Sequence, residues 1–207
     1  MDINKLWVSG TESDWSAMLD SYWNYVKPDN MQLEKDMDVL NPDYVKKLDA
    51  QGWYDFLLNK YFRWKYTAPN RYATTTNYLK KYCENGRLHV LNQIKDCLFS
   101  FDKENIEAGL SIKISGLGVA GRSGLLSLLF PKHFGTVDQF VVKALLNVTR
   151  LPERNLLTSM NPNGLTIKDG VILIQIMRQK STELNNKFKT DSWTPRKIDQ
   201  ILWACRD

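Results

Sequence analysis

The spacing of the apolar side chains restricts this chain to one class of fold. Along nearly all of its 207 residues, apolar positions recur every three or four residues, which is the period of an amphipathic helix. A β-strand would alternate every second residue, and no such segment is followed by a hairpin turn. The β-branched run 171–177 is also interpreted as helical, because Thr166 and Asp169 have the spacing of a capping box. The sequence therefore predicts an all-α protein.

Caps and breaks divide this pattern into separate helices. Thr11 or Ser13 is expected to cap the first helix, and Thr194 followed by Pro195 to start the last one. Gly52 is expected to separate two helices, and residues 28–41 are expected to form turns. The predicted helices cover residues 11–26, 42–50, 53–66, 72–82, 88–99, 103–111, a segment that ends at Pro131, a segment that begins near 136, residues 166–188 and residues 195–205.

Length and composition exclude several classes of protein. A chain of 207 residues forms one or at most two domains and buries roughly 70% of its unfolded surface. Its 43% hydrophobic and 25% charged residues exclude a disordered, collagen-like or disulfide-stabilised chain. The sequence contains no apolar run of the ~18 residues that cross a membrane and does not start like a signal peptide. Three widely separated cysteines, Cys83, Cys97 and Cys205, fit a reducing cytoplasm, and we expect their thiols to be buried.

The net charge of +5 is unevenly distributed along the chain. Residues 1–50 hold five lysines and no arginine against ten acidic residues, so the remaining 157 residues carry the positive charge. Residues 60–82 contain six basic side chains and no acid, and residues 108–152 contain five basic side chains and one acid. Such a basic surface is typical of proteins that neutralise phosphates. We therefore divide the chain into an acidic, aromatic-rich helical segment, 1–50, packed on the core, and a domain over 51–207.

The segment 103–148 contains the most informative motif. A short amphipathic helix leads into Gly116-Leu117-Gly118, and a second helix follows until Pro131. The two glycines allow a tight turn, and the free backbone amides at the start of the second helix point outward from its positive end. Such a helix start is a phosphate-binding device. A single Gly-x-Gly is also common in ordinary turns.

Asp138 follows this hairpin by 22 residues. Thr136 and Gln139 have the spacing of a capping pair, which places Asp138 in the first turn of the next helix. An acidic residue there can simply favour the helix dipole. It is nevertheless the one acidic residue among the five cations of residues 108–152, on a surface that otherwise attracts anions.

The order of helix, glycine hairpin, helix, loop and Val137-Asp138 resembles the helix-hairpin-helix superfamily of DNA base-excision glycosylases. The match covers residues 103–148, and weaker similarity covers residues 62–65 and 199–203. The resemblance implies a compact, all-helical fold of two lobes with an active-site cleft between them. It also implies that the hairpin amides grip a DNA phosphate, often with a monovalent cation held by backbone carbonyls.

Carried over residue by residue, the resemblance assigns roles to two groups of residues. Asp138 would be the catalytic carboxylate, because a fixed carboxylate stabilises the oxocarbenium character that develops when an N-glycosidic bond breaks. The DNA-binding residues would be Gly116, Leu117, Gly118, Ala120 and Arg122.

The base pocket is expected among aromatic and basic residues that interleave over 53–72. A flipped base gains stacking and hydrogen bonds in such surroundings, which offset the few kcal/mol of extrusion. We select Trp64, Lys65 and Arg71 as pocket residues. Each aromatic residue of this stretch is also a natural core residue.

Departures from the family pattern narrow the expected activity. Family members that also cleave the strand carry a lysine where this chain has Ala120, so no amine is expected there to form a Schiff base. Ser115 and Gln139 replace the usual proline and threonine beside the hairpin and the aspartate. Only Cys205 lies in the C-terminal region where some relatives hold an iron–sulfur cluster, so we expect no cluster, no side-chain metal site and no required cofactor.

These observations favour a monofunctional DNA glycosylase that flips out a damaged or modified base, hydrolyses its N-glycosidic bond and leaves an abasic site. Its role would be DNA repair or defence against modified phage DNA, and the excised base is left open. The alternative is a non-catalytic helix-hairpin-helix module that binds DNA. We expect DNA as the partner, no membrane contact, a monomer, and a location in the bacterial cytoplasm or on the nucleoid.

Overall fold

The computed structural model describes residues 2–205 and is built from helices that begin at polar caps. Thr11 and Thr166 each form a full capping box with the aspartate three residues later. Thr194 accepts a hydrogen bond from the N–H of Lys197, with Pro195 in the first helical position. Three of the predicted helix starts are thereby confirmed, since side-chain caps satisfy N–H groups that have no partner within the helix.

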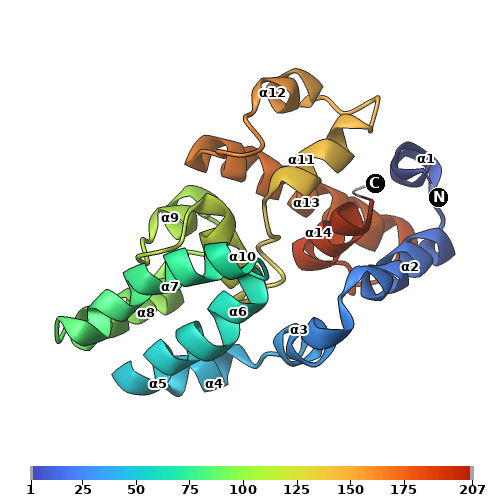
Figure 1. The fold of residues 1–207 in the computed structure, drawn as a ribbon. Helices are drawn as coiled ribbons and strands as arrows, with labels where there is room; N and C mark the ends of the chain where they lie inside the picture. Colours follow the sequence, from blue (N-terminus) through green and yellow to red (C-terminus); the bar gives the residue numbers. More distant parts are fainter. Residues whose placement is uncertain (1, 206–207) are drawn as a thin grey trace.

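No β-strand occurs among residues 2–205, so the predicted all-α class is confirmed (Figure 1). The helices are α1 (Ile3–Ser9), α2 (Glu12–Ser21), α3 (Met31–Asp38), α4 (Pro42–Lys47), α5 (Ala50–Phe56), α6 (Phe62–Lys65), α7 (Pro69–Glu84), α8 (Leu88–Ser100), α9 (Ile106–Ser111), α10 (Val119–Leu129), α11 (Gln139–Leu146), α12 (Arg154–Ser159), α13 (Ile167–Phe188) and α14 (Pro195–Ala204). Two 3₁₀ turns (Tyr22–Tyr25 and Pro28–Asn30) and a π-helical segment (Leu57–Tyr61) complete the list.

Two local predictions are wrong. Residues 28–41 are not mainly turns, because they include α3, whose buried side chains Glu34 and Met37 are anchored by tertiary contacts. Gly52 does not break a helix, because Asp49 caps α5 and accepts a hydrogen bond from the Gly52 N–H at 2.7 Å. The local sequence does not favour a helix in either segment. Tertiary packing stabilises α3 and the Asp49 cap stabilises α5, and these contributions outweigh the local propensity.

The chain leaves one group of helices and returns to it (Figure 1). It starts with α1 and α2, passes through α3 into the group α4–α10, and comes back through α11 and α12 to α13 and α14. α14 packs against α2, α11 and α13, while α10 contacts both α13 and α14. Both ends of the described chain lie on the same side, where Asp2 and Cys205 line one shallow cavity of about 460 Å³.

Side chains from residues 2–50 contribute to the same hydrophobic core as the rest of the chain. Lysines of α13 hold the first helices through backbone carbonyls: Lys180 donates to Trp7 at 3.1 Å and Lys187 to Gly10 at 2.9 Å. α4, which ends just before residue 50, and α5, which begins at residue 50, both pack against α8. The acidic segment is therefore part of the folded core.

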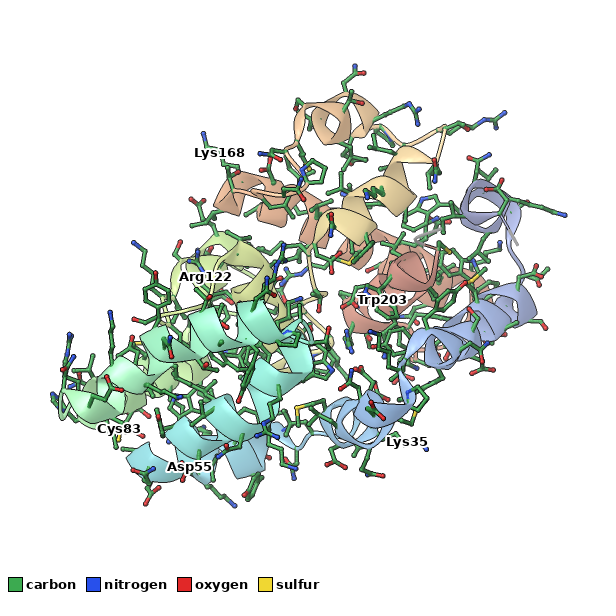
Figure 2. The ribbon with its side chains drawn as sticks, viewed as in Figure 1. Lys35, Asp55, Cys83, Arg122, Lys168 and Trp203 are labelled. Carbon is green, nitrogen blue, oxygen red and sulfur yellow. The ribbon has the colours of Figure 1, made fainter. Side chains whose placement is uncertain are left out.

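The surface position of two thiols differs from expectation. Cys83 and Cys97 are exposed, because they lie on the outward faces of α7 and α8, whereas Cys205 is partly buried. Cys83 lies at the outer edge of the molecule, far from Trp203 (Figure 2). No disulfide joins these cysteines within residues 2–205. None of the helices within residues 2–205 has the length and apolar character needed to cross a bilayer.

Candidate functional site

One cavity of about 670 Å³ lies where segments from most of the chain meet. Its lining comes from within the segments 22–34, 64–71, 118–120, 136–141, 162–165 and 196–203. The aromatic side chains of the lining are Tyr22, Tyr25, Trp64, Tyr66, Phe140 and Trp203. This volume falls in the range of sites that hold small organic ligands, and the aromatic walls suit a flat ligand.

Most residues nominated from the sequence line this cavity, although their positions are far apart in the chain. The nominated residues in the lining are Trp64, Lys65, Arg71, Gly118, Ala120 and Asp138. Gly116, Leu117 and Arg122 are outside the lining. The fold thus brings the expected carboxylate, the start of the second hairpin helix and the expected base-pocket residues to one place.

Asp138 is the N-cap residue of α11. Its Oδ1 accepts hydrogen bonds from the N–H groups of Phe140 at 2.9 Å and Val141 at 3.2 Å. The predicted capping pair of Thr136 and Gln139 is therefore wrong, because the helix begins two residues later than that pair requires. Both bonds use Oδ1, so Oδ2 of this partly buried carboxylate makes no hydrogen bond within residues 2–205.

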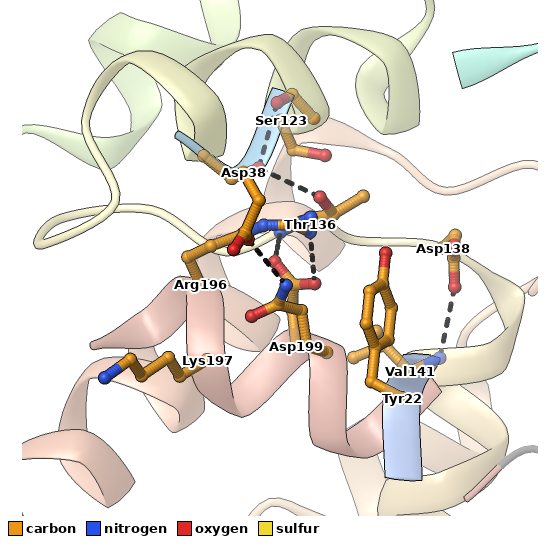
Figure 3. Close-up of polar contacts among 12 residues, drawn as sticks. Tyr22, Asp38, Ser123, Thr136, Asp138, Val141, Arg196, Lys197 and Asp199 are labelled. Carbon is orange, nitrogen blue, oxygen red and sulfur yellow. Dashed lines mark hydrogen bonds and ion pairs between the residues drawn. The ribbon is translucent and has the colours of Figure 1, made fainter. Parts of the chain in front are cut away.

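The extended segment before α11 is fixed from two other helices (Figure 3). The N–H of Thr136 donates to Oδ2 of Asp199, in α14, at 2.6 Å. The N–H of Val137 donates to the hydroxyl of Ser123, in α10, at 2.9 Å. These buried bonds set the direction in which the chain delivers Asp138 to the cavity.

A buried ion cluster, formed by Glu34, Arg196 and Asp199, supports the same wall. Arg196 donates to Oδ1 of Asp199 at 2.8 Å and to Oε1 of Glu34 at 3.4 Å. Glu34 also accepts hydrogen bonds from the hydroxyl of Tyr22 at 2.5 Å and from the indole N–H of Trp64 at 2.7 Å. Burial raises the pKa of Asp199 to about 6, although the Arg196 charge opposes this shift. Two carboxylates thus share one guanidinium, and all three side chains are largely buried.

Lys65 enters the cavity beside this cluster. A Cβ built on Gly124 of α10 would lie 3.3 Å from Cδ of Lys65 and 2.9 Å from the hydroxyl of Tyr61, so the glycine makes room for both side chains. The ammonium nitrogen lies 5.9 Å from the Trp64 ring centroid. Burial lowers the pKa of Lys65, and the nearby Asp138 carboxylate opposes this shift.

The turn between α9 and α10 is held by backbone contacts. Gly116 has a φ of 90°, and a Cβ there would lie 2.4 Å from the carbonyl oxygen of Thr75, so the turn requires glycine. The guanidinium of Arg122 donates to the carbonyl oxygens of Leu110 at 2.5 Å and Gly118 at 3.4 Å. Arg122 therefore ties the two helices together within the protein.

Gly118 is the N-cap residue of α10, and no side chain caps this helix. A Cβ built on Gly118 would meet no atom within 4 Å, so the space beside it is open. The helix has no acidic residue in its first turn. Residues 118–120 line the cavity, so the positive end of α10 lies where an anion in the cavity can approach it.

Sequence reasoning missed the residues that build the wall behind Asp138. Glu34 and Arg196 are separated by 162 positions, and no local pattern connects them. Asp199 did leave a signal, because it lies between Ile198 and Ile201 on the apolar face of α14 and three residues after an arginine. An acidic residue on a buried helix face usually has a partner, which the i,i+3 arginine supplies.

Comparisons of this chain with models of protein families, with curated proteins and with solved structures find no match. The chemistry of the cavity must therefore be argued from its own residues.

Proposed function

We propose that this protein is a monofunctional DNA glycosylase of the helix-hairpin-helix superfamily. In this proposal α9, the turn 112–118 and α10 are the helix-hairpin-helix motif, and the cavity is the cleft between two lobes that receives the flipped base. The observation that carries the proposal is that Asp138 and the uncapped start of α10 line the same cavity. The carboxylate suits a positively charged sugar, and the free N–H groups suit the neighbouring phosphate.

Base removal breaks the bond between the sugar carbon C1′ and the base nitrogen, and the bonding electrons leave with the base. Asp138 would stabilise the positive charge that develops on the sugar ring. Water then adds to C1′ while Asp138 takes one of its protons. A proton is returned to the departed base, so the products are a neutral free base, an abasic site and an ionised Asp138. At Ala120 there is no amine that could attack the sugar, which supports hydrolysis without strand cleavage.

The base would be held by the residues around the aromatic wall. Trp64 is fixed by its hydrogen bond to Glu34, so its ring is pre-positioned for stacking. Lys65 and Arg71 supply hydrogen-bond donors to the cavity. Tyr22 and Glu34, from the acidic N-terminal segment, also line the cavity.

Two backbone carbonyls of the hairpin, where a monovalent cation was expected, accept hydrogen bonds within the protein. The carbonyl oxygen of Gly116 accepts a hydrogen bond from the hydroxyl of Tyr66 at 3.3 Å, and that of Gly118 accepts from Arg122. A guanidinium beside Gly118 repels a second cation. Within residues 2–205 no group of three His, Cys, Asp or Glu side chains is placed to hold a metal ion. We propose a reaction that requires no cofactor.

A non-catalytic DNA-binding module is the alternative. One observation favours it: Asp138 has a structural task, since Oδ1 caps α11. In that case the carboxylate would be present for the helix alone, and α10 would still bind phosphate. In either case we propose a monomer that acts on DNA in the cytoplasm or on the nucleoid, in repair or in defence against modified DNA.

The test is a panel of duplex and single-stranded oligonucleotides that carry different modified bases, scored for abasic sites by alkaline cleavage. Asp138→Asn should reduce single-turnover excision by about 10²–10³-fold, because it removes the charge that faces the sugar. Asparagine caps helices as well as aspartate does, so the free energy of unfolding should change little.

The matched control is Asp49→Asn, which alters another N-cap aspartate, at α5, far from the cavity lining. It should leave excision unchanged. An Asp138→Asn protein that is folded and excises as fast as the parent would favour the non-catalytic module.

A further inference from the structure

Lys65 is a cation without an acceptor in the cavity that holds Asp138. No hydrogen bond or ion pair joins its Nζ to another of residues 2–205, and its contact is the face of the Trp64 ring. Its stem lies beside Gly124 of α10, and its side chain is part of the cavity lining. An unpaired, partly buried ammonium requires an acceptor, and a ligand in the cavity is the group that can provide one.

The neighbouring charges come from several elements. They are Asp138 at the start of α11, Asp199 and Arg196 in α14, and Glu34 in α3. Arg71 of α7 and the hydroxyl-bearing Tyr66, which follows α6, also line the cavity. Glu34 and Asp199 are already paired with Arg196, which leaves Asp138 as the acid that balances Lys65. Burial lowers the pKa of Lys65, so its ammonium gives up a proton more readily than an exposed lysine does.

Departure of a base requires an acid when the base is neutral. The electrons of the broken bond remain on the base, and an anion is costly to form inside a cavity with little water. A positively charged N-alkylated base leaves as a neutral molecule, so it needs no acid and would be repelled by an ammonium group.

We propose, building on the glycosylase function above, that Lys65 donates a proton to the departing base and thereby selects neutral bases over cationic N-alkylated ones. The proton passes from Nζ to a ring nitrogen or carbonyl oxygen of the base as the bond to C1′ breaks. Water adds to C1′ and gives its proton to Asp138. Transfer of that proton back to Lys65 through solvent restores both groups.

The experiment measures single-turnover excision from duplexes that carry 8-oxoguanine, uracil or 5-hydroxymethylcytosine as neutral bases and 7-methylguanine or 3-methyladenine as cationic bases. Lys65→Met keeps the apolar stem and removes the proton. It should slow excision of the preferred neutral base by roughly 10²-fold or more and should not slow that of a cationic base. Lys80→Met, an exposed lysine outside the cavity lining, is the control and should excise at the parental rate.

The pH profile separates proton donation from mere attraction. The parental rate should fall at alkaline pH as Lys65 loses its proton, with a midpoint below the ordinary lysine value of 10.5, and Lys65→Met should lack this limb. Lys65→Arg keeps the charge but binds its proton too tightly, so it should remain slow.

Several results would overturn the inference. If the parental protein excises only cationic bases, the proton-donor role of Lys65 is wrong and the glycosylase function still holds. If it excises no base at all, both the proton-donor role and the glycosylase function are wrong. Parental rates in Lys65→Arg would show that charge suffices. A covalent adduct between DNA and Lys65 after borohydride reduction would show that the amine attacks the sugar instead.

Discussion

Two helix starts line the same cavity, and they present opposite charges to it. α10 begins at Gly118 without a side-chain cap, whereas α11 begins at Asp138, whose Oδ1 accepts two of the helix N–H groups. The backbones at both caps are extended, with φ and ψ of −73° and −173° at Gly118 and of −157° and −176° at Asp138. The difference is therefore one side chain.

That side chain decides what each helix start can bind. The N–H groups of α10 are free, and with the helix dipole they attract an anion such as a phosphate. At α11 the carboxylate satisfies N–H groups and adds a negative charge, so this end favours a cation. A nucleotide undergoing base loss carries both features, a phosphate and a sugar that becomes positive.

The starts also differ in how they are held. The segment before α11 is attached to the buried ion cluster through Asp199, whereas the turn before α10 is attached through backbone carbonyls and Arg122.

Arg196→Met removes the shared partner of Glu34 and Asp199 and leaves both acids buried. The free energy of unfolding should fall by about 3–5 kcal/mol in urea titrations. Lys60→Met, which breaks an exposed pair with Asp36, should cost less than about 1 kcal/mol.

The loss in Arg196→Met should depend on pH. The folded-state pKa of Asp199 is already raised to about 6 and rises further when Arg196 is absent. For an acid whose pKa is raised by folding, the stability present at low pH is lost as pH rises through the folded pKa. The variant should therefore be less impaired at pH 5 than at pH 8, and an equal loss at both values would contradict the ion-cluster account.

Gly118→Asp gives α10 the same kind of cap as α11. The open space beside Gly118 accepts the new side chain, so the free energy of unfolding should stay within about 0.5 kcal/mol of the parent. A carboxylate on the free N–H groups should lower DNA affinity by roughly 10²-fold, through both competition and repulsion.

Gly118→Ser is the matched variant, since it caps the helix without charge and should weaken DNA binding less. Fluorescence anisotropy at two salt concentrations measures both effects. Unchanged affinity in Gly118→Asp would mean that α10 does not contact the phosphate.

Gly116→Ala tests the turn rather than the helix start, and its effect should be smaller than that of Arg196→Met. Its φ of 90° and the close approach of the Thr75 carbonyl predict a loss of about 1–3 kcal/mol in the free energy of unfolding. Thermal unfolding of Gly116→Ala and of the control Gly86→Ala separates the cost of the positive φ from that of the contact with Thr75. Gly86 also has a positive φ, but a Cβ there would meet no atom within 4 Å. Equal losses would show that the contact with Thr75 is unimportant.

Much of the local structure could be predicted because its causes are local. Thr11, Thr166 and Thr194 cap helices through residues three positions away, and helical periodicity identified α13 although its sequence is rich in β-branched residues. The prediction for the start of α11 was wrong by two residues, because Thr136 uses its N–H to reach Asp199 and its hydroxyl to reach Ser127. A competing tertiary contact thus displaced a plausible local cap.

The sequence by itself determined the all-α class, the helix starts at Thr11, Thr166 and Thr194, the glycine turn at Gly116 and the nomination of Asp138. The tertiary structure decided that Trp64, Lys65 and Asp138 share one cavity, that Arg122 turns toward the backbone, and that Glu34 joins Arg196 and Asp199 behind the wall. The physical reason is the range of the interactions. Periodicity, caps and turns act within a few residues, whereas a cavity and a buried ion cluster exist only after packing brings distant helices together.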